Sequence, residues 1–235
     1  MKLAINMIVF NGETLIGAAL RSVLPFVDEA LVMDTGSNDQ TMAILHGLQK
    51  EFPQLQVFQE DVQHLGPVWT GSRKDVELTR LLNVLRQRTK SEWIMRIDDD
   101  EIYPEDLMNE INDLQPTEDY YALFWYHVPK SNPCKMWNPY FFRHLMVLRI
   151  FRNIPEISWG GSYGQETIMV GKMRIPTRKC KSLKHHFLHL GEFRNRYDRE
   201  KDIHGYLKQY QQAKDRFKCD VLKDLPQQYA KYIPQ

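Results

Sequence analysis

Four consecutive acidic residues, Asp98-Asp99-Asp100-Glu101, follow an apolar run that begins at Trp93. The apolar run is typical of a buried strand. Adjacent carboxylates repel one another unless a cation or water offsets their charge. Because carboxylate oxygens suit Mg²⁺ and Mn²⁺, which keep positions open for substrate phosphates, we predict a divalent metal site here. The alternative is that the acids cap the next helix, and both can hold together.

Two earlier apolar segments, 3–10 and 30–33, also end in polar residues: Asn11-Gly12-Glu13 after the first and the loop 34–39 after the second. Helical periodicity over 13–24, which Pro25 ends, and over 40–50 gives the order strand, helix, strand, helix. This order indicates a largely parallel sheet, whose carboxyl ends meet at one edge. Ligands of open α/β sheets bind at that edge, so we expect the three polar loops to converge there.

The rest of the chain continues the alternation. We predict strands at 55–58, 121–128 and 145–151, helices at 73–89 and 107–114, and a loop with short strands over 154–177. The segment 129–143 is rich in Pro, Asn and aromatic residues and is predicted to be a long loop. Its aromatic side chains stack on a sugar or base or, more commonly, pack on the core: Trp137, Tyr140 and Phe141.

Composition limits the class of protein. The 235 residues suffice for one catalytic unit, and 31 basic against 30 acidic residues give a net charge of +1, which does not predict binding to nucleic acid. Three widely spaced cysteines predict free thiols in a reducing compartment. No cleavage pattern and no run of ~18 apolar residues is found. We therefore expect a cytoplasmic protein without a transmembrane segment; a peripheral membrane contact by the helix predicted over 193–217 stays open, although its mixed charge does not favour it.

The loops also argue against two enzyme classes. Neither Asn11-Gly12-Glu13 nor 34–39 carries the glycine fingerprint of a dinucleotide-binding dehydrogenase or of a P-loop protein. Instead, Asp34 ends the second strand, where its carboxylate can accept hydrogen bonds from a base or ribose.

With these residues assembled, the chain resembles a family 2 glycosyltransferase of the GT-A fold over about residues 3–192. The matching segments are Ile8 to Glu13, Val32 to Thr41, Ser72-Arg73 and Trp93 to Glu101, the last resembling the family's Asp-x-Asp-Glu (DXD) motif. Segments 149–153, 164–166 and 189–191 resemble the bacterial subset related to lipopolysaccharide core glucosyltransferases. The resemblance implies an α/β GT-A domain with a mostly parallel central sheet flanked by helices, a nucleotide-binding half at about 1–101, an acceptor half at about 102–192 and a helical extension over 193–235.

The implied activity is transfer of a sugar, with inversion, from a nucleotide-diphosphate donor, a UDP-sugar first, to a glycan or other hydroxyl acceptor in surface glycan synthesis. The resemblance implies Mn²⁺ or Mg²⁺ on Asp100 and a late histidine, His189, for which His185 and His186 are rivals. Arg73 pairs either with a phosphate or with Asp34 and Asp98 as a structural salt bridge. The implied contacts of the nucleotide sugar are Phe10, Asn11, Glu13, Asp34, Arg73, Asp98, which contacts ribose or metal, and Asp99.

Inverting transfer requires one general base near the acceptor oxygen. The resemblance implies Glu166, with Asp99 and Glu101 as rivals. Two other functions stay open. A nucleotidyltransferase would bind a nucleotide and metal at strand ends but would usually show a Gly- and Lys/Arg-rich phosphate loop near the N-terminus. A non-catalytic sugar-nucleotide-binding or scaffold protein is suggested by Gln165, where the subset carries His.

Overall fold

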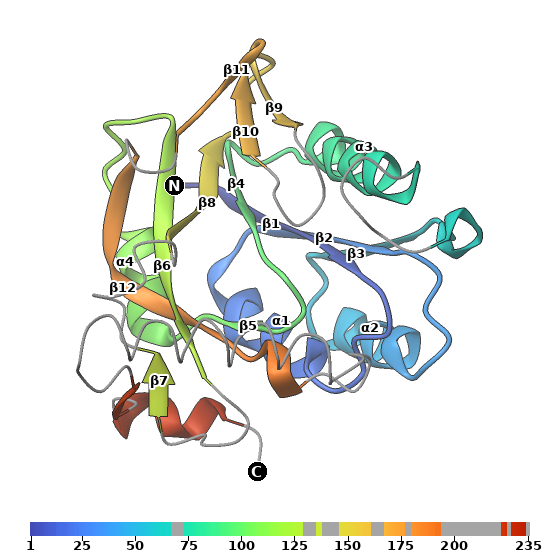
Figure 1. The fold of residues 1–235 in the computed structure, drawn as a ribbon, viewed down its shortest axis with the longest axis horizontal. Helices are drawn as coiled ribbons and strands as arrows, with labels where there is room; N and C mark the ends of the chain where they lie inside the picture. The colour runs from blue at the N-terminus through green and yellow to red at the C-terminus, as the bar shows by residue number, and fades with distance from the viewer. Residues whose placement is uncertain are drawn as a thin grey trace, which may run out of the picture.

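The computed structural model describes residues 1–66, 73–128, 135–137, 146–160, 167–176, 180–193, 222–224 and 227–233 (Figure 1). Its centre is an eight-stranded mixed sheet in the order β3-β2-β1-β4-β8-β6-β12-β5. Four of the neighbouring pairs are parallel (β3–β2, β2–β1, β1–β4 and β6–β12), and β8 and β5 run against their neighbours. The strands are β1 (Leu3–Val9), β2 (Glu29–Asp34), β3 (Leu55–Gln59), β4 (Trp93–Arg96), β5 (Glu101–Ile102), β6 (Tyr120–His127), β8 (Met146–Arg152) and β12 (Lys181–His189).

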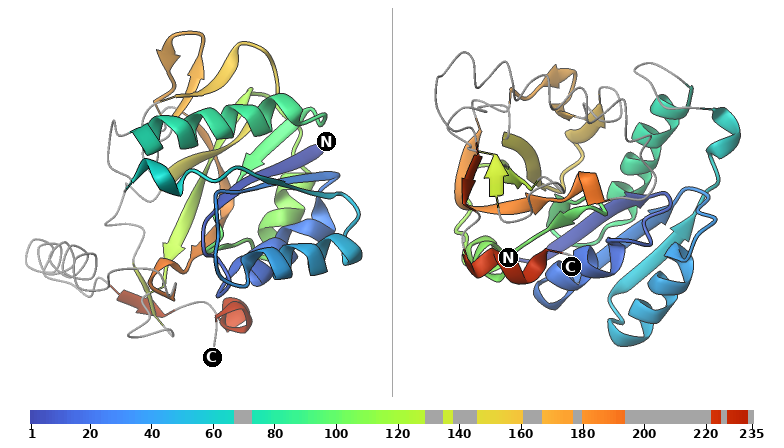
Figure 2. Two further views of the ribbon diagram at one scale, coloured as in Figure 1. Left: turned by 90° about the vertical axis from the view of Figure 1, so that its right-hand side faces the viewer. Right: turned by 60° about the horizontal axis from the view of Figure 1, so that its bottom comes forward.

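Helices cover both faces of this sheet. On one face lie α1 (Ile16–Val23), α2 (Thr41–Glu51) and α4 (Glu105–Asn112), and on the other lies α3 (Arg73–Arg88), as Figure 2 shows. Short 3₁₀ turns follow α1 (Leu24–Phe26), β3 (Gln63–Leu65) and β12 (Gly191–Phe193). The predicted class, an α/β fold with a mostly parallel sheet flanked by helices, is confirmed.

Strands β1 and β4 are buried on both faces, as central strands of a covered sheet must be. Along β4, Trp93 and Met95 pack with the helices α1, α2 and α4, whereas the intervening Ile94 packs with α3. This alternation follows from the period of two of an extended chain. Such two-sided burial explains why the strands read as nearly continuous apolar runs.

Two small sheets complete the fold. One is three-stranded, with β9 (Ile157–Gly160), β10 (Thr167–Val170) and β11 (Met173–Arg174), and lies beside α3. The other pairs β7 (Lys135–Trp137) with β13 (Leu222–Asp224), so part of the predicted loop 129–143 is a strand. Beyond them, the 3₁₀ helix η5 (Gln227–Tyr232) packs on α4, where the hydroxyl of Tyr229 donates to Asp106 Oδ2 at 3.1 Å.

Three further predictions concern the start of α1, the segments 129–143 and 193–217, and membrane-spanning helices. The helix predicted from residue 13 begins at Ile16, after a turn in which the Gly12 carbonyl accepts from two backbone N–H groups, and it ends at Val23, before Pro25. Phe193, where the helix predicted over 193–217 would begin, ends the 3₁₀ turn after β12; residues 194–217, Tyr140 and Phe141 lie outside the described residues. Within the described ranges, no helix has the length and apolar character needed to cross a membrane.

Candidate active site

Strands β3, β2, β1, β4, β6 and β12 all run in one direction, because β8 is antiparallel to both β4 and β6. Their carboxyl ends therefore meet at one edge, which we call the carboxyl edge. The loops after Val9, Asp34 and Arg96 lie there, as predicted. The last residues of β6 and β12, His127 and His189, reach the same edge.

The loop after β1 is bound to the loop after β2. The Asn11 backbone N–H donates to Ser37 Oγ at 2.8 Å, and Asn11 Oδ1 accepts from the Asn38 N–H at 2.9 Å. Asn11 adopts a φ of 50°, a left-handed conformation that asparagine tolerates better than most residues. The carboxylate of Glu13 accepts from the Gln40 N–H at 3.0 Å. Asn11 and Glu13, predicted as nucleotide contacts, thus join the two loops.

Asp34 has one oxygen in use and one without a partner. Its side chain is buried (1% exposed), and Oδ1 accepts from the backbone N–H groups of Gly36 at 3.2 Å and Ser37 at 3.1 Å. Oδ2 is buried and has no hydrogen-bond partner in the described part of the chain. Because an unsatisfied buried acceptor is costly, this atom is suited to receive a ligand N–H.

A lysine that was not predicted from the sequence lies beside this loop. Lys74, near the start of α3, is buried; its Nζ lies 5.3 Å from the centroid of the Phe10 ring and donates to Gln63 Oε1. Gln63 in turn donates to the Thr35 carbonyl at 2.7 Å. Burial lowers the pKa of Lys74, and the charge of Asp61 partly opposes this.

Arg73, the residue predicted in this place, is exposed and makes no ion pair in the described residues. The structural salt bridge considered for it is therefore absent from these residues. A signal for Lys74 was available, because it falls at helical spacing with the buried residues of α3: Leu78, Leu81, Leu82 and Leu85.

Two buried arginines offset part of the acidic cluster. Asp98 accepts from Arg96 Nη2 and from Arg149 Nη2, each at 2.9 Å, and Arg149 also pairs with Glu101. Glu101 Oε2 accepts from the hydroxyl of Tyr103 at 2.9 Å. We expected a divalent metal to offset the repulsion within the cluster, and arginine side chains also do so at Asp98 and Glu101. The signal was an arginine within each of the apolar strands β4 and β8.

The surroundings of Glu101 also change its pKa. Burial raises its pKa to about 7, and Arg149 counteracts part of that rise while Asp98 and Asp100 add to it. Both oxygens are occupied, which ties the acidic loop to β8. Helix capping does not explain the cluster either, since α4 begins at Glu105 with Pro104 in the cap position and no side-chain cap.

Asp99 and Asp100 point to different neighbours. A Cβ placed on Gly12 would lie 2.8 Å from Asp99 Oδ2, so the buried Asp99 side chain packs against the turn after β1. Asp100 Oδ2 lies 3.5 Å from His189 Nε2, and the Asp100 carbonyl accepts from the Leu190 N–H at 2.8 Å. The structure thus brings together the two residues predicted as metal ligands.

The rival histidines have other neighbours. His185 Nδ1 lies 2.8 Å from Glu110 Oε2, and the His186 ring stacks on Tyr126 with centroids 4.4 Å apart. The described residues contain no group of three or more His, Cys, Asp or Glu side chains that could hold a metal. The oxygen of Asp100 and the nitrogen of His189 nevertheless form a donor pair of the kind that Mn²⁺ accepts, so these residues fit the ion.

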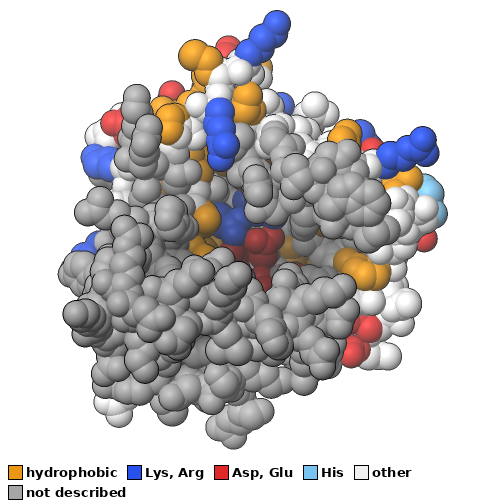
Figure 3. All heavy atoms as spheres, in the orientation of Figure 1, with side chains coloured by type: hydrophobic (Ala, Val, Ile, Leu, Met, Phe, Trp, Pro, Cys, Tyr) orange, Lys and Arg blue, Asp and Glu red, His pale blue; other side chains and the backbone are white. Residues whose placement is uncertain are grey.

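The proposed general base, Glu166, and its neighbour Gln165 lie outside the described residues. The rivals Asp99 and Glu101 are both buried. In the space-filling view, acidic and basic side chains lie side by side in a hollow near the middle of one face (Figure 3).

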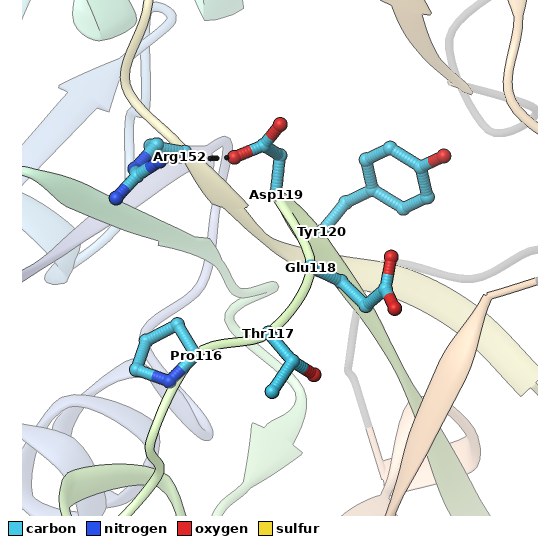
Figure 4. Close-up of a pocket in the computed structure, with 6 residues that line it drawn as sticks. All are labelled: Pro116, Thr117, Glu118, Asp119, Tyr120 and Arg152. Carbon is cyan, nitrogen blue, oxygen red and sulfur yellow. Dashed lines mark hydrogen bonds and ion pairs between the residues drawn. The ribbon is translucent and has the colours of Figure 1, made fainter.

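A pocket of about 210 Å³ lies at the other end of the strands. It is lined by Arg152, at the end of β8, and by residues 116–120, which lead into β6. Arg152 points toward Asp119 and pairs with it at 3.2 Å (Figure 4). β6 begins at Tyr120, which lines the pocket, and ends at His127, which lies at the carboxyl edge. The pocket therefore lies at the opposite edge of the sheet, which we call the amino edge.

No family model matches the chain, and no curated protein matches it. Among solved structures, a TarS structure from S. aureus is similar with a TM-score of 0.45 and 18% identity, over 65% of this chain and 47% of that one. A second, in complex with UDP, has a TM-score of 0.42 and 21% identity, over 55% and 37%. Glucosyl-3-phosphoglycerate synthase from Mycobacterium tuberculosis, with Mn²⁺ and UDP, has a TM-score of 0.37 and 23% identity, over 54% and 44%. The chain thus spans less than half the length of these proteins.

Proposed function

We propose that the protein is a glycosyltransferase that uses a nucleotide-diphosphate sugar, bound at the carboxyl edge of the sheet. One observation carries the proposal. Asp34 ends β2 and has a buried carboxylate oxygen with no partner among the described residues, while Asp100, in the loop after β4, lies 3.5 Å from His189, which ends β12 at the same edge of the sheet. A ligand with an N–H group at one end could donate to Asp34, and a diphosphate at its other end could bind a cation held by Asp100 and His189. A nucleotide-diphosphate sugar carries these two groups.

The nucleoside would lie at the ends of β1 and β2. Asp34 Oδ2 accepts a ring N–H, which uracil, thymine and guanine carry and neutral cytosine lacks. The half-buried ring of Phe10 offers a face for the base, with the ammonium group of Lys74 close to that ring. A UDP-sugar is therefore the first donor to test.

The diphosphate would lie near Asp100 and His189. These two side chains would hold a divalent cation, Mn²⁺ or Mg²⁺, which when bound neutralises the charge that develops on the leaving diphosphate. Asp98 stays fixed between Arg96 and Arg149, which positions the loop that carries Asp100.

Transfer follows as a single displacement. The acceptor hydroxyl oxygen forms a bond to the anomeric carbon while the bond from that carbon to the diphosphate oxygen breaks, so the configuration inverts. The hydroxyl proton passes to a general base, for which Glu166 is our proposal. By resemblance the acceptor is a glycan or another hydroxyl compound of bacterial-type surface glycan synthesis.

The test is a panel of UDP-, GDP-, dTDP- and CMP-sugars, measured for binding and for hydrolysis with Mn²⁺ and with a chelator. We expect one diphosphate donor to bind in a metal-dependent way and CMP-sugars to bind least. Replacement of Asp34 by Asn leaves an oxygen for the Gly36 and Ser37 N–H groups and puts an NH2 group, a donor, in place of Oδ2. It should weaken binding of the preferred donor at least about tenfold, as expected when a buried charged hydrogen bond is lost.

Asp119→Asn, at the amino edge, is the matched control because it makes the same chemical change far from the proposed site. It should leave donor binding unchanged. If no nucleotide sugar binds the wild-type protein with or without metal, the proposal fails and a scaffold role becomes the better account.

A further inference from the structure

A second histidine lies behind the proposed metal ligand. His127 is the last residue of β6 and is paired in register with His189, the last residue of β12. The two Nδ1 atoms lie 3.0 Å apart, and His127 is buried (1% exposed). The Val128 N–H also donates to the His189 carbonyl at 3.2 Å, so the contact is held by the sheet as well as by the rings.

We propose that His127 is a positioning residue that fixes the tautomer of His189, so that the Nε2 lone pair of His189 faces Asp100. This inference rests on the proposed function, because it concerns the same metal pair. The hydrogen bond between the two rings requires a proton on one Nδ1 and a lone pair on the other.

Only one of the two proton arrangements serves a metal. If His127 donated to His189, a neutral His189 would carry its proton on Nε2 and have no lone pair for a cation. If His189 donates from Nδ1, its Nε2 lone pair faces Asp100 Oδ2 at 3.5 Å. The Nε2 lone pair of His189 and Oδ2 of the buried Asp100 would then face a shared cation together. For His189 to hold that cation, His127 must be the acceptor, with its own proton on Nε2.

The surroundings keep both rings in place. Trp125, two residues before His127 in β6, meets the His189 ring edge-on with centroids 4.5 Å apart and the His127 ring at 5.9 Å. A partner behind a metal-binding imidazole typically changes metal affinity or activity by 10- to 100-fold. His127 thus extends the site by one residue that never touches the ion.

The first measurement uses the unmodified protein. In ¹⁵N NMR of the histidine rings with saturating Mg²⁺, His189 should carry its proton on Nδ1 and His127 on Nε2. A proton on Nε2 of His189 in the metal-bound protein would overturn the inference.

The second measurement compares two variants by the dissociation constant for Mn²⁺, titrated without any donor. In His127→Asn, the amide oxygen replaces the acceptor at the Nδ1 position, and affinity should stay within about threefold of wild type. In His127→Phe, which retains the bulk and lacks the acceptor, affinity should fall by about 10- to 100-fold. Equal losses in both variants would indicate packing alone and contradict the proposal.

The same titrations distinguish a failure of the role of His127 from a failure of the proposed metal site. If Mn²⁺ binds the wild type and His127→Phe equally while Asp100→Ala abolishes binding, the metal pair stands and only the role of His127 is wrong. If the wild type binds no divalent cation, both the metal pair and its positioning residue are wrong.

Discussion

The carboxyl edge and the amino edge of the sheet each hold a cluster of charged side chains, and they differ in burial. At the carboxyl edge, Arg149 pairs with Asp98 and Glu101, and its side chain is 8% exposed. At the amino edge, Arg152 pairs with Glu92 and Asp119, both at 3.2 Å, and its side chain is 42% exposed. The two arginines belong to the same strand, three residues apart, so the difference lies in their surroundings.

The buried ion pairs of Arg149 hold the acidic loop in place, whereas the exposed ion pairs of Arg152 contribute little to stability. An exposed pair gains little because water already solvates both charges. A buried pair leaves an uncompensated charge if one member is removed. The acidic loop of the candidate site is therefore tied to β4 and β8 by buried ion pairs, whereas the ion pairs of the pocket at the amino edge are exposed to water.

The largest effect is expected for Arg149→Met. It leaves the buried Glu101 without its guanidinium partner, and the free energy of unfolding should fall by about 3–5 kcal/mol. Urea unfolding measures this. The matched change Arg152→Met should lower it by less than about 1 kcal/mol. Equal losses in both variants would remove the distinction between the edges.

A double variant sharpens the same comparison. Adding Glu101→Gln to Arg149→Met removes the buried charge that the first change exposes, so part of the stability should return. The corresponding pair at the amino edge, Arg152→Met with Asp119→Asn, should show additive and small effects. Additivity at both edges would show that Glu101 and Arg149 are not coupled.

An intermediate effect is expected at Gly191. A Cβ there would lie 2.8 Å from His189 Cε1 and 3.2 Å from Asp100 Oδ2, so Gly191→Ala should push the metal pair apart and weaken Mn²⁺ binding about tenfold. Gly47→Ala is the control, because Gly47 lies in α2 with nothing near its Cβ position. It should leave Mn²⁺ binding unchanged and raise stability by about 0.5–1 kcal/mol. An unchanged affinity in Gly191→Ala would place the ion elsewhere.

The smallest effect concerns His186. Burial lowers its pKa in the folded protein, so the unfolded chain binds its proton more readily and stability falls as the pH drops below about 6.5. His186→Phe retains the ring stack on Tyr126 and lacks this loss. Urea unfolding at pH 7.5 and 5.5 should therefore show a smaller decrease for the variant. The same decrease in both proteins would show that the lowered pKa of His186 does not contribute to the loss of stability.

The sequence predicted most of the strands and helices as far as β8, because apolar periodicity reports which faces are covered, but it did not predict β5 or β12. It also predicted that Asp34 and Asp100 reach one edge, since parallel strands impose this. His189 came only from the family resemblance, because the strand that carries it, β12, was not predicted. The sequence did not predict Lys74, Arg96, Arg149 or His127 as parts of the site. Their positions depend on which distant strands pair, and a charged residue in an apolar strand reveals its partner only when the register is known.

The central claim, a nucleotide-sugar site at the carboxyl edge, is tested most directly by calorimetric titration of UDP in the presence of Mn²⁺. The wild type and Asp119→Ala should bind UDP equally. Asp100→Ala, and the wild type with a chelator, should bind at least about tenfold more weakly, in keeping with the loss of a ligand-bridging cation. UDP binding that is indifferent to metal and to Asp100, or that is lost in Asp119→Ala, would contradict the account.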